Sequence, residues 1–387
     1  GSLSLYPMSA VVFWSLVGLL VSALVYYIFA LYAAWRFFQD GASDRDPLPP
    51  VSILKPLKGA SPDLYSNLAS FCQLDCSVFQ IVCGVRDPED PAIAIVRKLQ
   101  QDFPQCDITL VIEPSVIGTN YKVSNLHHLM QQVKHDYIVI TDSDVSVDPD
   151  YLSTIIQPLM SPDVGLVTCV YRAAVIQPFP SLLESLIINT SFTTQVIVAS
   201  QVEQPAYAFG ATIALKRPIL EAIGGFAALR DYLADDYYLG FLVARAGYKV
   251  RILPTVVETH PDATSLKDLF QHQLRWARTQ RNCRPSGHLG TVVTYGTVWA
   301  CIGLTCFWTS SAVALLSGSV IGVRLFTAGI MSVTFLRSRL PVTALLLIPL
   351  TDIISFIVWC ASLRGNTVQW QEYTFRVQKD GRMVRVG

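Results

Sequence analysis

Hydrophobic and polar residues divide this chain into apolar blocks near both ends and a mixed block between them. Residues 9–38 are almost uncharged until Arg36, and they exceed the ~20 apolar residues that a helix needs to cross a bilayer. Gly1-Ser2 is interpreted as a cloning remnant, and Gln39–Pro50 as a polar linker. The predicted regions are an N-terminal transmembrane anchor (9–38), a folded domain (50–285), a C-terminal transmembrane region (290–363) and a polar, basic tail (364–387).

Short apolar runs alternate with amphipathic helical stretches inside the folded domain. The runs that indicate strands are Val51–Leu54, Gln80–Val85, Ile108–Ile112, Tyr137–Thr141 and Gly165–Tyr171. The helical stretches between them include Asp63–Leu74, Pro91–Asp102 and Lys122–Val133. Alternation of this kind is typical of an α/β fold in which helices flank a mostly parallel sheet.

The C-terminal apolar region contains two clear candidate spans, Thr291–Leu316 and Pro341–Leu363. Gly318–Leu336 is ambiguous, because Arg324 would lie inside the bilayer. It is either a re-entrant or interfacial segment, or a span with Arg324 near one end. Residues 178–200 are apolar but too polar in their middle to predict a span, so we expect an interfacial helix pair there, with a buried core helix as the alternative.

Basic residues beside the apolar blocks predict the orientation of the chain. Arg36 follows the first block, and four arginines precede the second one, namely Arg275, Arg278, Arg281 and Arg284. Lys and Arg accumulate on the cytoplasmic side of membrane proteins. We therefore expect a cytoplasmic domain, and a cytoplasmic tail then requires an even number of C-terminal crossings.

Composition agrees with a membrane protein and excludes some partners. Hydrophobic residues make up 51% of the chain and charged residues only 15%, which is too apolar for an ordinary soluble enzyme. The formal net charge is zero, so no overall basic field favours nucleic acid as a partner. The 9 cysteines are scattered, which suggests reduced thiols facing a reducing compartment.

Two carboxylates follow the predicted strand 137–141. Asp142 and Asp144 are one residue apart, so an extended chain sends both side chains to the same side. Ligands of open α/β sheets bind at the carboxyl ends of strands. Carboxylate oxygens are ligands that Mg²⁺ or Mn²⁺ accepts. The pair therefore predicts a metal–nucleotide site, and a solvated turn is the alternative.

Other acidic residues stand at comparable positions. Asp87 ends the predicted strand 80–85, where it is either a ligand for a base or ribose or a turn residue before Pro88. Asp235 and Asp236 begin an apolar segment. Either they stabilise a helix N-terminus, or one of them is a general base whose pKa is tuned by its neighbours.

A basic and aromatic motif precedes the second apolar block. It reads His272-Gln273-Leu274-Arg275-Trp276. Arg275 can bind a phosphate with two hydrogen bonds, and Trp276 can shield a site from water. For the later arginines a positive flank of a membrane span is the simpler interpretation.

Together these elements resemble the D, D-x-D, D, (Q/R)-x-x-R-W pattern of lipid-directed and processive family 2 glycosyltransferases. The whole chain resembles the ceramide glucosyltransferase-like family (family 2/21), whose wider group includes hopanoid-biosynthesis glycosyltransferases. Further stretches agree, namely Val51–Gly59 with Lys55, Asn120–Leu126 with Lys122, and Phe209–Thr212 with Gly210. The chain departs from the pattern at His272, where the family has Gln or Arg, so the role of that position stays open.

The resemblance implies a GT-A fold, a nucleotide-sugar donor and inversion at the anomeric carbon. It implies that Asp236 is the catalytic base and that Arg275 and Trp276 act at the diphosphate and the acceptor. Donor binding is expected from Lys55, Asp87, Lys122, Asp142, Gly210 and Asp235. Metal binding is expected from Asp144 and Asp142. His260 is added as a possible third ligand for Mg²⁺ or Mn²⁺, although a plain surface histidine is the simpler interpretation.

The expected reaction moves a hexose from a UDP-sugar, with UDP-glucose favoured, to the hydroxyl of a membrane lipid such as ceramide. Transfer of N-acetylglucosamine from UDP-N-acetylglucosamine to a hopanoid is an alternative, because the extra acetyl group of that donor leaves no signature in the composition of the enzyme. A polysaccharide synthase would need more spans. A non-catalytic membrane scaffold with a GT-A-like domain is the alternative from a different class. The expected partners are the UDP-sugar, the lipid acceptor and the bilayer.

Overall fold

The computed structural model describes residues 6–39 and 47–386, which form two compact units. Gly1-Ser2 and most of the predicted linker lie outside the described residues. We call the first the helical unit; it contains Gly1–Phe38, Val175–Val198 and Ala263–Gly365. We call the second the sheet unit; it contains Gln39–Ala174, Ala199–Asp262 and Asn366–Gly387. Each unit is thus assembled from separate stretches, which differs from the sequential regions that the hydrophobic pattern predicts.

An eight-stranded mixed sheet forms the centre of the sheet unit, in the order β3-β2-β1-β4-β7-β6-β8-β5. Its strands are β1 (Val51–Pro56), β2 (Phe79–Val85), β3 (Asp107–Ile112), β4 (Tyr137–Ile140), β5 (Val145–Ser146), β6 (Val164–Ala173), β7 (Ile213–Lys216) and β8 (Lys249–Thr259). The five predicted strands are all present, and the predicted α/β class with a mostly parallel sheet is confirmed. The sequence pattern missed β5, β7 and β8.

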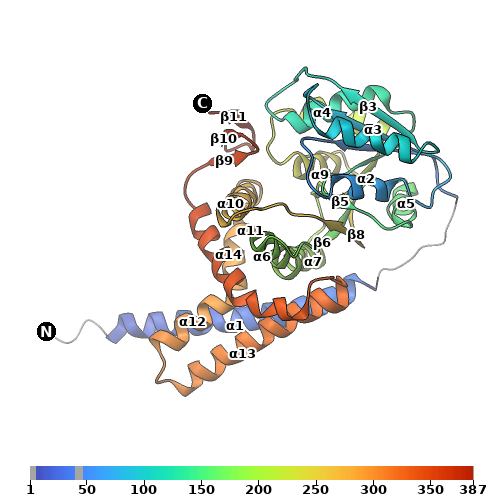
Figure 1. The fold of residues 1–387 in the computed structure, drawn as a ribbon. Coiled ribbons are helices and arrows are strands. Elements are labelled where there is room, and N and C mark those ends of the chain that lie inside the picture. The colour runs from blue at the N-terminus through green and yellow to red at the C-terminus, as the bar shows by residue number, and fades with distance from the viewer. Residues whose placement is uncertain (1–5, 40–46, 387) are drawn as a thin grey trace. The chain divides into compact units, whose positions relative to one another are not determined.

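Helices cover both faces of this sheet (Figure 1). They are α2 (Leu64–Phe71), α3 (Ala92–Asp102), α4 (Tyr121–Leu129), α5 (Tyr151–Ile156), α8 (Arg217–Ala222) and α9 (Asp235–Arg245). Val123 of α4 and Leu239 of α9 join one buried cluster with strand residues such as Leu54 and Ile140. Strands covered on both faces read as continuous apolar runs, which is why the sequence pattern shows them so clearly.

Strand directions bring the functional segments to one edge of the sheet. β1 runs parallel to β2 and β4, and β6 runs parallel to β8. β7 is antiparallel to both β4 and β6, so it reverses the direction twice and leaves these five strands pointing the same way. The residues after β2, β4 and β8 and those before β7 therefore meet at this edge.

The predicted tail is a folded part of the sheet unit. β9 (Thr367–Trp370), β10 (Tyr373–Val377) and β11 (Met383–Arg385) form a three-stranded antiparallel sheet, which we call the C-terminal sheet (Figure 1). Its buried side chains alternate with exposed ones along β10, as expected for a strand with one covered face. The covered face packs around Leu233, in a cluster with Val368, Phe375, Val377 and Met383.

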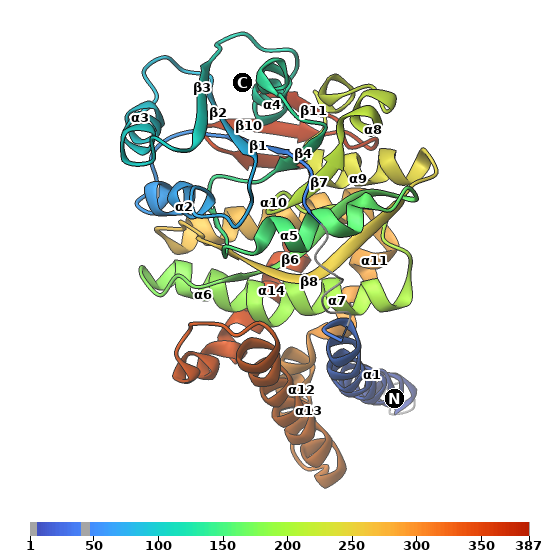
Figure 2. The ribbon, with the colours of Figure 1, turned by 90° about the vertical axis from the view of Figure 1, so that its right-hand side faces the viewer.

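The helical unit consists of helices, most of which are apolar. They are α1 (Tyr6–Phe37), α6 (Phe179–Ile187), α7 (Thr193–Val202), α10 (Leu266–Cys283), α11 (Pro285–Gly290), α12 (Gly296–Cys306), α13 (Ser311–Gly329) and α14 (Ile348–Ser362). Four helices in the described chain are long and apolar enough to cross a membrane, namely Ala10–Phe37, Phe179–Val202, Ser311–Phe335 and Val342–Ser362. A bent pair, Pro285–Thr294 with Gly296–Cys306, adds a fifth candidate. Figure 2 shows α12 and α13 side by side.

Several details of the predicted spans differ. The stretch predicted as one span, Thr291–Leu316, is broken because α12 ends at Cys306 and Ser310 caps the start of α13. The expected interfacial helix pair at 178–200 is instead one span-length helix with a π-helical turn at Ile188–Phe192. Most of it is buried, which favours the alternative of a core helix.

The ambiguous segment around Arg324 is helical, and the arginine is buried inside the unit. Its guanidinium makes two hydrogen bonds to Asp352, at 3.0 and 2.7 Å. It also donates to the carbonyl of Thr190 at 2.9 Å and to Ser191 Oγ at 3.0 Å, both in the π-helical turn. Thr297 donates to Asp352 at 2.6 Å. The ion pair therefore ties together α13, α14, α12 and the turn between α6 and α7.

We predict that Asp352→Ala strongly destabilises the protein, because it leaves the Arg324 guanidinium buried without a counter-charge. Breaking one partner of a buried ion pair typically costs about 3–5 kcal/mol. Thermal unfolding of the detergent-solubilised protein measures the effect. Asp75→Ala is the matched control, since Asp75 is exposed. Equal melting temperatures for the two variants would contradict the prediction.

Candidate active site

Asp142 lies just beyond the carboxyl end of β4, and its backbone is held from two sides. Its N–H donates to the carbonyl of Gly210 at 3.1 Å. The ammonium of Lys55 donates to the carbonyl of Asp142 at 2.8 Å. Because Gly210 directly precedes β7, this hydrogen bond joins the ends of neighbouring antiparallel strands. The D-x-D segment is therefore a fixed part of the sheet edge.

Lys122 holds the carboxylates of two separate segments. Its Nζ lies 2.6 Å from Asp142 Oδ1 and 3.4 Å from Asp235 Oδ2. Burial opposes the charged ammonium, but the charges of Asp142, Asp235 and Asp236 outweigh burial and raise the pKa of Lys122. The ammonium therefore stays charged, and its presence lets three carboxylates approach one another.

Asn120 positions Lys122, a role that the sequence analysis did not assign to it. Its side-chain oxygen accepts from Val123 N–H at 3.0 Å and so caps α4. Its amide nitrogen donates to Tyr232 O at 2.8 Å and to Asp235 Oδ1 at 3.3 Å. One buried side chain thus connects the N-termini of α4 and α9. Only the neighbouring Asn-Tyr-Lys pattern could have indicated this role.

Asp236 lies in the first turn of α9, close to the same loop. Its Oδ2 accepts from Gly210 N–H at 2.9 Å, and its Oδ1 accepts from Tyr237 N–H at 2.8 Å. Burial and the neighbouring Asp235 raise the pKa of Asp236 to about 6, against the opposing charge of Lys122. A carboxylate with a pKa in this range can accept a proton near neutral pH.

Gly210 is the centre of this arrangement for a steric reason. A Cβ at this position would lie 2.5 Å from Asp142 Oδ2 and 3.1 Å from Lys122 Nζ. The side chains of Asp142 and Lys122 fill the space beside Gly210, so the glycine permits the carboxylate–lysine cluster. The donor-binding role expected for Gly210 stays a prediction.

Lys55 lies behind the cluster and is fully buried. Its ammonium faces Asp142 O and lies 4.0 Å from the ring centre of Phe71. Burial lowers the pKa of Lys55 to about 8, although the charges of Cys83, Asp144 and Asp142 oppose this. The expected direct contact with a donor is therefore not supported by its position. Lys55 instead holds the backbone of Asp142 and adds positive charge beneath the D-x-D segment.

Asp87 is exposed at the carboxyl end of β2. Its Oδ1 accepts from Glu89 N–H at 2.9 Å, which is the turn predicted before Pro88. Beside it, the Arg86 guanidinium lies 4.1 Å from the ring centre of Tyr121. The Tyr121 ring meets Tyr373 of the C-terminal sheet edge-on, with ring centres 5.2 Å apart. The sequence pattern gave no sign that Tyr373 lies here.

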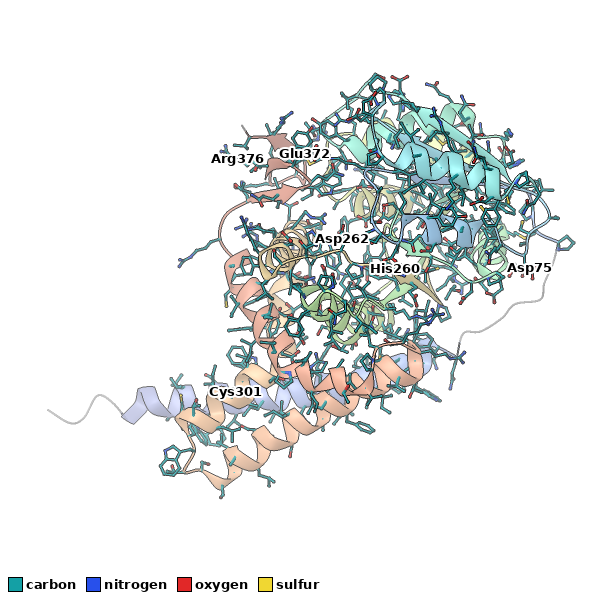
Figure 3. The ribbon with its side chains drawn as sticks, viewed as in Figure 1. Asp75, His260, Asp262, Cys301, Glu372 and Arg376 are labelled. Atoms are coloured by element: carbon teal, nitrogen blue, oxygen red, sulfur yellow. The ribbon has the colours of Figure 1, made fainter. Side chains whose placement is uncertain are left out.

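His260 is next to Asp144, but its ring faces the backbone. Asp144 O accepts from His260 N–H at 2.9 Å, and His260 Nδ1 lies 3.1 Å from the same oxygen. Its Nε2 lies 3.7 Å from Glu258 Oε1. Figure 3 labels His260 and Asp262 at the end of β8. In the described part of the chain no three His, Cys, Asp or Glu residues are grouped to hold a metal, and the role of His260 as a third ligand stays a prediction.

Asp142 and Asp144 nevertheless fit a divalent cation bound together with a nucleotide. Burial and the charge of Asp142 raise the pKa of Asp144 to about 7. This electrostatic cost would be relieved by a cation. Mg²⁺ is usually held by one or two carboxylates together with water and substrate phosphates, without an all-protein cage. The donor set present therefore suits a metal–diphosphate complex.

The remaining predicted residues, Arg275 and Trp276, lie on α10 in the helical unit. The Trp276 ring centre is 5.8 Å from that of Phe192. The divergent His272 has its Nδ1 3.5 Å from Glu184 Oε2, and Gln273 donates to Glu184 Oε1 at 3.3 Å. The motif is therefore anchored on a buried carboxylate of α6. The roles expected for Arg275 and Trp276 stay predictions.

The fold and the carboxylate–lysine site suit a nucleotide ligand, because open α/β sheets bind ligands at the carboxyl ends of their strands. The long apolar helices suggest membrane association. The chain belongs to glycosyl transferase family 21, which residues 15–383 match. An enzyme is thereby established, and the scaffold alternative falls away.

Relatives of this chain are named ceramide glucosyltransferases. Ceramide glucosyltransferase 3 of Caenorhabditis elegans is 22% identical over 380 residues, covering 93% of this chain and 80% of that protein. Ceramide glucosyltransferase 1 of the same organism is 26% identical over 276 residues, covering 71% of this chain and 58% of that protein. The sequence resemblance to this family is confirmed.

A solved structure shares the fold. The mannosyltransferase PcManGT from Pyrobaculum calidifontis, in complex with GDP-Man and Mn²⁺, matches with a TM-score of 0.54 at 19% identity. The match covers 90% of this chain and 99% of that chain. At this identity the likeness shows the fold, and it confirms the predicted GT-A type.

We predict that Gly210→Ala disrupts the site, because the added Cβ would clash with the Asp142 carboxylate and displace it from Lys122. Misplacement of a binding group by about 1 Å can cost about 10²-fold in activity. Calorimetric titration with a nucleoside diphosphate and Mn²⁺ should show weakened binding. Gly318→Ala is the control, since no atom lies within 4 Å of a Cβ there. Unchanged nucleotide binding by Gly210→Ala would refute the steric argument.

Proposed function

We propose that this protein transfers a hexose, with glucose favoured, from a UDP-sugar to the hydroxyl group of a membrane lipid such as ceramide, with inversion at the anomeric carbon. The observation that carries the proposal is the cluster of Asp142, Lys122 and Asp236 around Gly210. It combines a potential proton acceptor with groups that suit a diphosphate. The relatives named ceramide glucosyltransferases support the choice of lipid and sugar.

The donor side of the site uses the carboxyl ends of β2 and β4. Asp87 would bind the uridine, supported by its exposure at the strand end. Asp142 and Asp144 would hold Mg²⁺ or Mn²⁺, which when bound supplies positive charge beside the diphosphate. The Mn²⁺ named with PcManGT supports this assignment. Lys122 keeps the Asp142 carboxylate in place, and Asp235 acts on donor binding through its ion pair with Lys122.

The transfer step needs one base and stabilisation of the leaving group. The lipid hydroxyl attacks C1 of the sugar while the bond from C1 to the UDP oxygen breaks. Asp236 takes the hydroxyl proton, and the electron pair of the broken bond leaves with UDP. Lys122 and Arg275 oppose the negative charge that grows on the diphosphate. Trp276 would limit access of water at the acceptor mouth.

The bilayer supplies the acceptor in this proposal. The span-length helices of the helical unit support membrane attachment. Arg36 at the end of α1 and the arginines of α10 support a cytoplasmic position for the sheet unit, because basic flanks stay on that side. Nucleotide sugars are made in the cytoplasm, so donor and acceptor would meet at the cytoplasmic surface of the membrane.

Product analysis with purified protein tests the substrates. The protein in lipid vesicles with Mn²⁺ should convert UDP-glucose and ceramide to a glucosylated ceramide, detected by mass spectrometry. The parallel reaction with UDP-N-acetylglucosamine and a hopanoid should give little product. A reversed preference would overturn the proposed substrates while leaving the enzyme class intact.

We predict that Asp236→Asn lowers kcat by ~10²–10⁴-fold, because the amide cannot accept the hydroxyl proton. The Asn oxygen can still accept the hydrogen bond from Gly210, so binding of UDP with Mn²⁺ should change little. Measured rates of glycolipid formation and calorimetric UDP binding separate the two effects. Asp75→Asn, at an exposed position labelled in Figure 3, serves as the control. Full activity of Asp236→Asn would exclude it as the base.

We also predict an acid limb in the pH dependence of kcat/KM. Asp236 must be ionised to act, and its pKa is raised to about 6, so the rate should rise with pH through about 6 and then level off. The charged groups acting on it are Asp235 on α9, Lys122 on α4 and Asp142 after β4. Asp235→Asn removes a like charge and should move the limb to lower pH. A limb that stays in place would contradict this origin.

A further inference from the structure

The C-terminal sheet is bonded to the short segment that leads into the catalytic acids. Met383 N–H donates to Asp231 O at 2.7 Å, and Leu233 N–H donates to Gly381 O at 3.3 Å. Between these bonds Tyr232 and Arg382 form an isolated antiparallel bridge. The segment 231–234 thus adds to the edge of a sheet whose strands come from the far end of the chain.

Side chains reinforce this backbone pairing. Leu233 is buried among Val368, Phe375, Val377 and Met383, so the segment contributes one apolar side chain to the core of the C-terminal sheet. In the first turn of α9, Tyr238 donates from its hydroxyl to Asp380 O at 3.2 Å. A Cβ on Gly381 would lie 2.2 Å from that hydroxyl oxygen, and Gly381 has a φ of +86°. The turn between β10 and β11 therefore requires glycine for contact with α9.

The same sheet contacts the start of α4. Thr119 Oγ1 donates to Met383 O at 3.1 Å, and Thr119 N–H donates to Asp231 Oδ1 at 3.1 Å. Asn120 N–H donates to Arg230 O at 2.8 Å. Lys122 follows three residues after Thr119, and Asp235 follows two residues after Leu233. One β-strand, β11, is thus in contact with both segments that carry the ion-paired residues.

Apart from the C-terminal sheet, the segment is held by contacts with the start of α4, through Thr119 and Asn120. It lies between the 3₁₀ turn Phe226–Leu229 and α9, and it has no hydrogen-bonded partner strand in the large sheet. The N-cap residue of α9, Ala234, offers no side-chain cap. The position of the first turn of α9, where Asp235 and Asp236 lie, therefore depends on tertiary contacts of Asp231, Tyr232 and Leu233.

We propose that the C-terminal sheet is a positioning element for catalysis, which sets the placement of Asp235 and Asp236 against Lys122. The proposal rests on the proposed function, in which Asp236 is the base. Residues of the C-terminal sheet act through the segment 231–234 and do not touch the reacting atoms. Loosening the sheet should lower kcat through Asp236 and leave the D-x-D segment, which is held by Lys55 and Gly210, in place.

Neighbouring residues of β10 provide a matched pair of variants. Phe375 is 2% exposed and belongs to the cluster around Leu233, whereas Arg376 is exposed. Figure 3 labels Arg376 and Glu372 on the C-terminal sheet. Phe375→Ala removes packing against the segment, and Arg376→Ala changes the same strand without doing so. Phe375→Leu restores most of the apolar volume and tests for rescue.

The test uses full-length protein in lipid vesicles and two readouts. In Phe375→Ala, hydrogen exchange of residues 231–238 should increase, kcat should fall about tenfold or more, and KM for the UDP-sugar should stay within about threefold. The acid limb of the pH profile should also shift, since the surroundings of Asp236 change. Arg376→Ala should match the wild type, and Phe375→Leu should recover most of the activity.

The outcomes separate this proposal from the proposed function. Unchanged exchange and unchanged kcat in Phe375→Ala, with an active wild type, would overturn the positioning role. An inactive wild type would overturn the proposed function. The hydrogen exchange of residues 231–238 would still test whether the C-terminal sheet positions this segment. If Phe375→Ala loses its overall melting transition, Tyr238→Phe takes its place, because it removes the hydrogen bond to Asp380 O and keeps the aromatic ring. Wild-type exchange and kcat in that variant would then overturn the proposal.

Discussion

The charge of Lys122 is the interaction on which the site depends. Three carboxylates, those of Asp142, Asp235 and Asp236, act on its ammonium from two separate segments of the chain. Without a cation between them, these like charges would repel one another and their segments would separate. The cluster exists because Gly210 leaves room for it and because Asn120 fixes the first turn of α4. An enzyme of glycosyl transferase family 21 thus builds part of its candidate active site around one partly buried ammonium.

The helical unit also contains a charge that needs partners, but there a single cation is buried and a carboxylate is its counter-charge. There a single guanidinium, that of Arg324, is buried among apolar helices and needs an acceptor for each of its donors. Asp352 supplies the counter-charge, and the π-helical turn at Ile188–Phe192 supplies the Thr190 carbonyl as a further acceptor. The polar middle of residues 178–200, which argued against a span in the sequence, is the part that receives the arginine.

The candidate chemistry combines these local constraints with the position of the sheet edge. Strand directions bring Asp87, Asp142 and Gly210 to one edge, and the carboxylates there suit a metal-bound diphosphate. Both oxygens of Asp236 accept backbone N–H groups, and burial keeps its proton affinity high. Carboxylates in one cluster can thereby have different roles, such as metal binding and proton acceptance, because their surroundings differ.

The amino-acid sequence alone predicts the α/β class, the five apolar strands, the apolar helices and the candidate acids that follow β2 and β4 and begin α9. These features follow from local periodicity and from residue types at strand ends, which neighbouring residues alone specify. Tertiary contacts were needed to reveal that β7 and β8 join the sheet, that Asn120 bridges two helix starts, and that the C-terminal residues fold onto the segment before Asp235. Those features depend on pairings between residues far apart in the chain. A short polar or mixed segment carries no local signal of the partner that it will meet.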